Sequence, residues 1–142
     1  MTATSHTGGR LIAAVLLCAS PLLASLACTG EPGDRTVRIG IRHSRFDPAA
    51  LSVRAGETVT FRLDNGDPIA HEFIIGTEAE QARHERGHDE THDGTPGAAS
   101  LDAGETDTIT YTFEKPGELV FACHLPGHYA YGMRGTITVR SP

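Results

Sequence analysis

The sequence predicts an all-β fold, a β-sandwich spanning about 105 residues, on three observations. From Thr36 onward, short stretches alternate apolar and polar side chains, as strands do when they bury one face. Turn sequences rich in Gly, Pro, Asn and Asp separate these stretches. The chain has 142 residues, which suits one domain, and the part from 36 to 140 is long enough for two packed sheets.

The first element along the chain, residues 1–27, is predicted to be an export signal. Arg10 supplies positive charge, the stretch "LIAAVLLCASPLLASLA" is apolar, and small residues precede Cys28. A permanent membrane span is the alternative. Pro21 interrupts the apolar stretch and the stretch ends in a cleavage pattern, so the sequence favours a signal peptide.

Cleavage after Ala27 makes Cys28 the mature N-terminus. The sequence "SLAC" resembles a bacterial lipobox, which predicts lipidation of Cys28 and a membrane tether. Ser25 stands where such motifs usually have Leu, and simple secretion is the alternative. Residues 28–35, "CTGEPGDR", are polar with Gly and Pro and are predicted to form a flexible tether to a domain at 36–142.

Five alternating stretches follow as predicted strands. A sixth stretch, "PIAHEFII", places His71 in phase with Phe73 and Ile75, at the start of a strand and on its buried face. The five are TVRIGIR (36–42), TVTFRL (58–63), TITYTF (108–113), LVFAC (119–123) and TITV (136–139).

One segment, around 77–100, interrupts this pattern and is predicted to be a short helix followed by a loop. Thr77 and Glu80 form a capping-box signature, good helix formers follow, and Gly87 is expected to end the helix. His84, His88 and His92 are four residues apart in this segment. They predict either an accessory metal site or a solvated acidic loop.

Charge and cysteine usage exclude some functions. Loss of Arg10 with the signal leaves 11 Lys and Arg against 18 Asp and Glu, a formal charge of −7, which argues against nucleic acid as a partner. Cys18 also leaves with the signal. Cys123 is then the one cysteine inside the predicted domain, so it has no internal disulfide partner and needs another role.

The stretch "CHLPGHYAYGM" gives that role. Cys123 offers a thiolate, His128 an imidazole and Met133 a thioether, and His71 supplies a second imidazole from another strand. A thiolate, two imidazoles and a weak thioether are the ligands of blue-copper sites. His43, before a turn, is a weaker candidate. The alternative is a buried small Cys, a turn His and a core-filling Met.

The "HEF" strand, the order Cys-x4-His-x4-Met and the final "GTITV" strand together resemble the cupredoxin (blue copper, plastocyanin/azurin-like) family over residues 36–140. The resemblance implies a Greek-key sandwich and one type 1 copper ion held by His71, Cys123, His128 and Met133. It also implies weak, transient docking of redox protein partners on an apolar patch. We expect the chain to be a monomer. The patch would comprise Leu125, Pro126, Tyr129 and Tyr131, for which packing under the loop is the alternative.

Two departures from the family pattern stand out. Glu72 follows His71 where many members have Asn, which affects the hydrogen bonds around the ligands. His124 directly follows Cys123, as in multicopper oxidases, but Ala122 replaces the second histidine of that pattern. We therefore expect no enzyme activity and an exposed His124 beside the site.

The expected function is transfer of single electrons by an exported, periplasmic or extracellular copper protein. The alternatives are copper binding, buffering or delivery in the cell envelope, and a metal-free adhesion or interaction sandwich.

Overall fold

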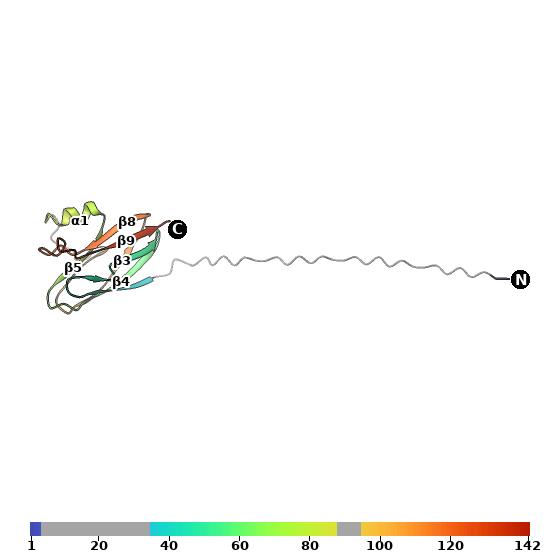
Figure 1. Cartoon of the computed structure of the whole chain (residues 1–142), viewed down its shortest axis with the longest axis horizontal. Coiled ribbons are helices and arrows are strands. Elements are labelled where there is room, and N and C mark those ends of the chain that lie inside the picture. The colour runs from blue at the N-terminus through green and yellow to red at the C-terminus, as the bar shows by residue number, and fades with distance from the viewer. Residues whose placement is uncertain (4–34, 88–94) are drawn as a thin grey trace.

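The computed structural model of the chain describes residues 1–3, 35–87 and 95–142. Residues 4–27 of the predicted signal peptide, Cys28 and most of the tether lie outside these residues. Within the described part, two sheets pack face to face with a short helix beside them (Figure 1). The predicted all-β sandwich is confirmed.

The first sheet has the strand order β2-β1-β4-β7. Its strands are β1 (Arg35–Ile41), β2 (Phe46–Asp47), β4 (Thr58–Asn65) and β7 (Thr106–Thr112). The second sheet has the order β3-β9-β8-β5-β6. Its strands are β3 (Ala50–Arg54), β5 (His71–Gly76), β6 (Ala98–Leu101), β8 (Gly117–Ala122) and β9 (Arg134–Arg140).

The chain crosses between the sheets rather than forming hairpins alone. β1 pairs with β4 and β3 pairs with β9, both in parallel, although β2 and β3 separate β1 from β4 in the chain. Parallel neighbours need a crossover connection, and here the crossover runs through the opposite sheet. The second sheet therefore combines strands from early and late in the domain, since the last strand, β9, lies between β3 and β8.

The core lies between the sheets and consists of the apolar faces of the alternating strands. Phe46, Phe61, Phe73, Phe113 and Phe121 are all buried there, and several of their rings meet edge to face. Such close-packed aromatic contacts make the interior stiff. A site built on its border inherits that rigidity.

The segment at 77–100 departs from the prediction in one respect. Helix α1 (Glu78–His84) begins at Thr77 with the predicted capping box, and Gly87 has a left-handed φ of 72°. The end of the segment was predicted to be loop, but Ala98–Leu101 forms β6 and pairs with β5. Its small side chains lack the β-branched pattern of a strand, and the exposed hydrogen-bonding edge of β5 supplies the reason for pairing.

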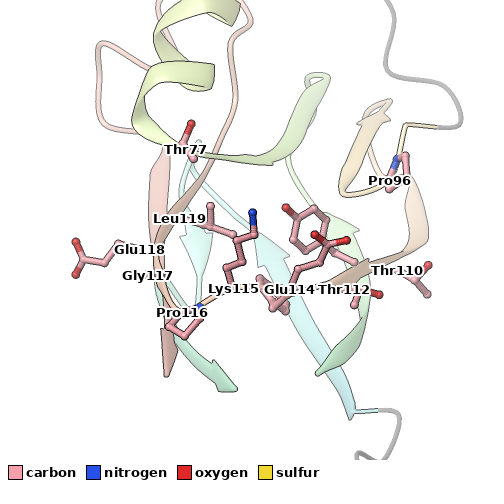
Figure 2. A pocket seen from close by; sticks show the side chains of 12 residues that line it. Thr77, Pro96, Thr110, Thr112, Glu114, Lys115, Pro116, Gly117, Glu118 and Leu119 are labelled. Atoms are coloured by element: carbon pink, nitrogen blue, oxygen red, sulfur yellow. The ribbon is translucent and has the colours of Figure 1, made fainter. Parts of the chain in front are cut away.

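A groove of about 730 Å³ lies between the end of β7 and the start of β8 (Figure 2). Tyr111, Lys115 and Leu119 line it. Cys123 follows the opposite end of β8, so this groove is separate from the predicted copper ligands. Among the described helices, none is long and apolar enough to cross a membrane.

Candidate metal centre

Two neighbouring strands bring the predicted ligands together. β5 and β8 run antiparallel, with Ile74 opposite Ala122, so the start of β5 lies beside the residues that follow β8. His71 is the first residue of β5 and Cys123 comes directly after β8. Both are buried, at 1% and 0% exposure. Register alone therefore brings together two residues separated by 52 positions.

The loop after β8 turns His128 back toward Cys123. His128 donates its backbone N–H to the Leu125 carbonyl at 2.9 Å, and Gly127 takes a left-handed φ of 85° that makes the turn possible. Its ring Nδ1 then lies 3.2 Å from Cys123 Sγ and 3.3 Å from His71 Nδ1.

These three atoms form a compact donor set. One thiol sulfur and two imidazole nitrogens, from Cys123, His71 and His128, all lie within 4.8 Å of one another. Among the described residues, these three side chains form a cluster of possible metal ligands. The combination of a soft sulfur with two imidazoles fits copper.

Met133 closes the loop. Its backbone N–H donates to the His128 carbonyl at 3.0 Å, and its carbonyl accepts the N–H of Cys123 at 3.2 Å. Its side chain is fully buried, in the same apolar cluster as Cys123. Met133 is thus hydrogen-bonded through its backbone to two of the three converging residues, and its thioether as a copper ligand stays a prediction.

Glu72 bridges the start of β5 and the residues that follow β8. Its backbone N–H donates to Cys123 Sγ at 3.3 Å, and its carboxylate Oε2 accepts the backbone N–H of His124 at 3.2 Å. The side chain therefore connects β5 to the residue after the thiol. This contact could not be predicted from sequence, because it depends on the pairing of β5 with β8.

Asp67 contacts a predicted ligand, His71, and was not singled out from the sequence. Its Oδ2 lies 3.0 Å from His71 Nε2, on the side of the ring away from Cys123. The backbone N–H groups of His43 and Ser44 donate to its two carboxylate oxygens at 2.6 and 2.7 Å. Burial alone would raise the Asp67 pKa, but the hydrogen bonds from Ser44, His43 and His71 outweigh it and hold the pKa below its usual value.

Burial also shifts the two converging groups on the loop. It raises the pKa of Cys123, and the nearby charges of Glu72 and Glu85 add to the rise, while N–H groups of Glu72 and Leu125 oppose it. Burial lowers the pKa of His128. Without metal, both groups are therefore held neutral, and the thiol must lose a proton when a metal binds.

His124 was predicted to be exposed, and that prediction is wrong. Its side chain is 5% exposed because α1 covers it. Gln81 donates through Nε2 to the carbonyls of Ile74 and Val120, so its Oε1 must be the atom 2.6 Å from His124 Nε2. The Glu85 carboxylate lies 3.0 Å from His124 Nδ1. Both ring nitrogens thus face acceptors, which leaves neither directed at a metal.

The predicted docking residues divide into two kinds. The Tyr129 ring stacks with that of His124 at 4.9 Å, and its hydroxyl donates to Glu78, so it packs against α1. Leu125 is half-buried against the core. Pro126 is exposed, and Tyr131 is 79% exposed. Docking of a partner on this loop remains a prediction.

The accessory histidines are only partly described. His84 is the last residue of α1, and its ring stacks with that of His124 at 5.5 Å. His88 and His92 lie outside the described residues. Because α1 ends at His84, the described helix does not extend to them, and accessory metal binding stays a prediction.

Comparison with known proteins assigns the family. Residues 35–140 match the copper-binding proteins of the plastocyanin/azurin family. The copper-resistant cuproprotein CopI of Rubrivivax gelatinosus is 42% identical over 120 residues, 78% of this chain and 73% of that protein. The corresponding CopI of Pseudomonas aeruginosa is 31% identical, over 75% of this chain and 76% of that one.

Solved structures agree with this assignment. Reduced auracyanin from Roseiflexus castenholzii superposes with a TM-score of 0.65 at 30% identity, over 75% of this chain and 98% of that one. Auracyanin B gives 0.63 at 28% identity, over 74% and 88%. The fold, the converging His-Cys-His donors and these matches lead to one conclusion: this chain belongs to the plastocyanin/azurin family of copper-binding proteins, the cupredoxins, and its cofactor is one copper ion.

Proposed function

We propose that this chain carries single electrons between redox partners, with His71, Cys123, His128 and Met133 as its copper ligands. The observation that carries the proposal is that three donor atoms already lie within 4.8 Å of one another at the border of a rigid core. Copper bound there supplies a one-electron Cu(I)/Cu(II) couple. Auracyanin A, which has a related structure, is a "blue" copper protein, and this supports the same assignment here.

The chain's own part in this function is to keep its ligands still. The Glu72 N–H donates to Cys123 Sγ, and the Asp67 carboxylate accepts from His71. A ligand set fixed by such outer hydrogen bonds rearranges little between oxidation states, which favours fast electron exchange. His128 is half-buried in the loop, and the exposed Tyr131 close to it offers a partner some apolar surface.

Copper handling is the second candidate, and the 42% identity to a copper-resistant cuproprotein favours it. Binding, buffering or delivery of copper would use the same ligands. We propose export to the periplasm or outer surface for either function, with lipidation at Cys28 as the anchor. Metabolic labelling with a fatty acid in the full chain and in Cys28→Ala tests the anchor.

Copper titration followed by visible absorption tests the ligands. We expect an intense blue Cu(II) band at one copper per chain, lost in Cys123→Ser and in His128→Asn. His43→Asn is the matched control, because the His43 side chain is exposed and His43 contacts Asp67 only through its backbone N–H. Asn also tolerates the left-handed φ of 54° at this position. A blue band that survives Cys123→Ser would refute the ligand assignment.

A chelator challenge then separates the two functions. An electron carrier should keep its copper and show a fast, reversible voltammetric wave. A buffer or delivery protein should release copper readily or take up more than one ion. Retention with a reversible wave supports electron transfer, and ready release supports copper handling.

A further inference from the structure

The two ring nitrogens of His71 have different neighbours. Nδ1 lies 3.3 Å from His128 Nδ1, inside the donor cluster, whereas Nε2 lies 3.0 Å from the Asp67 carboxylate. A carboxylate only accepts hydrogen bonds, so Nε2 must carry the proton. The lone pair is then on Nδ1, which faces Cys123 and His128.

The position of Asp67 is itself fixed. Arg42 and Arg45 exchange backbone hydrogen bonds across a turn in which His43 and Ser44 have left-handed φ values of 54° and 52°. Such values are uncommon outside Gly, and they direct two successive N–H groups at the carboxylate of Asp67. The turn thus builds an anion-binding cradle for one buried side chain.

Asn65 fixes the backbone of Asp67. Its Oδ1 accepts the Asp67 N–H at 3.1 Å, and its Nδ2 donates to the carbonyls of Ile69 and Asp102 at 2.9 and 2.8 Å. The loop that leads into His71 is therefore tied down before β5 begins. Because Asp67 is only 8% exposed and is held on both sides, its carboxylate has little freedom to move away from the ring.

We propose that Asp67 is a positioning residue that sets the tautomer of His71 and lowers the reduction potential of the site. This inference rests on the proposed electron-transfer function. Cu(II) carries one more positive charge than Cu(I), so a fixed, buried negative charge one imidazole away stabilises the oxidised state more. It also makes the imidazole a stronger donor, as carboxylate partners of metal-bound histidines generally do.

The test compares Asp67→Asn with Asp64→Asn by protein-film voltammetry on the copper-loaded mature chain. Both variants remove one carboxylate, but the Asp64 side chain is 57% exposed and pairs with Arg42 rather than with a ligand. Loss of an outer-shell partner changes metal affinity about 10–100-fold. If Asp67→Asn weakens the affinity for Cu(II) about tenfold and leaves that for Cu(I) unchanged, its reduction potential rises by about 59 mV.

Each outcome decides between the proposals. If the wild-type chain shows no reversible wave, the proposed function fails. If the wild-type wave is reversible and Asp67→Asn shifts it no more than Asp64→Asn, the role of Asp67 is refuted.

Should Asp67→Asn not fold, nitrogen-15 NMR of the Cu(I)-loaded wild-type chain decides instead. A slowly exchanging His71 Nε2–H supports the proposal, and a fast-exchanging one overturns it.

Discussion

Replacing Gln81 with Leu should lower the free energy of unfolding by about 2–4 kcal/mol. The Gln81 side chain is fully buried between α1 and the sheet. Its amide nitrogen donates to the strand carbonyls of Ile74 and Val120 at 2.9 and 2.8 Å, and its amide oxygen accepts from His124 Nε2 at 2.6 Å. Leu has a similar volume and is at least as good a helix former, so the substitution isolates these contacts.

The magnitude follows from the three lost hydrogen bonds. Each hydrogen bond contributes about 0.5–1.5 kcal/mol net. The partner groups also stay buried after the substitution without the hydrogen bond from Gln81, which adds to the cost. Extra apolar burial by Leu offsets part of that loss. Against a typical stability of about 5–15 kcal/mol, the change is large enough to measure in a urea titration.

The assay is urea unfolding of the metal-free protein followed by circular dichroism. Ala82→Leu, on the exposed side of the same helix, is the control and should stay within about 0.5 kcal/mol of wild type. Gln81→Glu should be at least as destabilising as Leu, because it cannot donate to the carbonyls of Ile74 and Val120. A loss below about 0.5 kcal/mol for Gln81→Leu would show that the amide network does not stabilise the fold. Copper stoichiometry should stay at one ion per chain, since α1 supplies no proposed ligand.

Three further outcomes follow from the structure. Gly135→Ala puts a methyl group into the ring of Phe121 and should cost about 1–3 kcal/mol in thermal or urea unfolding. Gly40→Ala should be tolerated, because its added methyl group would meet the Asp47 carbonyl at 3.8 Å, an ordinary van der Waals distance. Copper affinity should rise about tenfold per pH unit below the raised pKa of Cys123, because binding displaces the thiol proton; competition with a chelator over this range measures it. The pKa of His128 in the folded protein lies below its usual 6.5, so protonation of His128 favours the unfolded chain. The stability of the metal-free protein is therefore unaffected by His128 above pH 6.5 and falls as the pH drops from 6.5 through the lower folded pKa. His128→Gln should flatten that part of the stability profile, and an unchanged slope would contradict the assignment.

Local sequence signals predicted the elements that local physics determines. Thr77 and Glu80 cap α1 as their spacing indicates, because the capping box is made within four residues. The strand that contains His71 and Phe73 was predicted from its alternation. β6 was missed, because "AASL" has no strand pattern of its own and pairs only because the edge of β5 is available.

Part of the candidate site could also be predicted from the sequence, because three of the predicted ligands are close together in the chain. Cys123, His128 and Met133 lie within eleven residues, and a compact loop can bring them together. Asp67 lies in a turn sequence, where Asp is common for local reasons, and its i, i+4 spacing to His71 is a weak signal. Its importance comes from the amides of His43 and Ser44, more than 20 residues earlier.

The sequence by itself determined the β-sandwich, the family and the donor types, because alternation, turn residues and ligand chemistry are properties of short stretches. Only the tertiary structure decided which polar groups surround the donors. It placed Glu72 on the amide of His124, Asp67 behind His71, and α1 over His124. These contacts join residues that are distant in the chain, and strand register and loop packing, which no local pattern encodes, bring them within hydrogen-bonding distance.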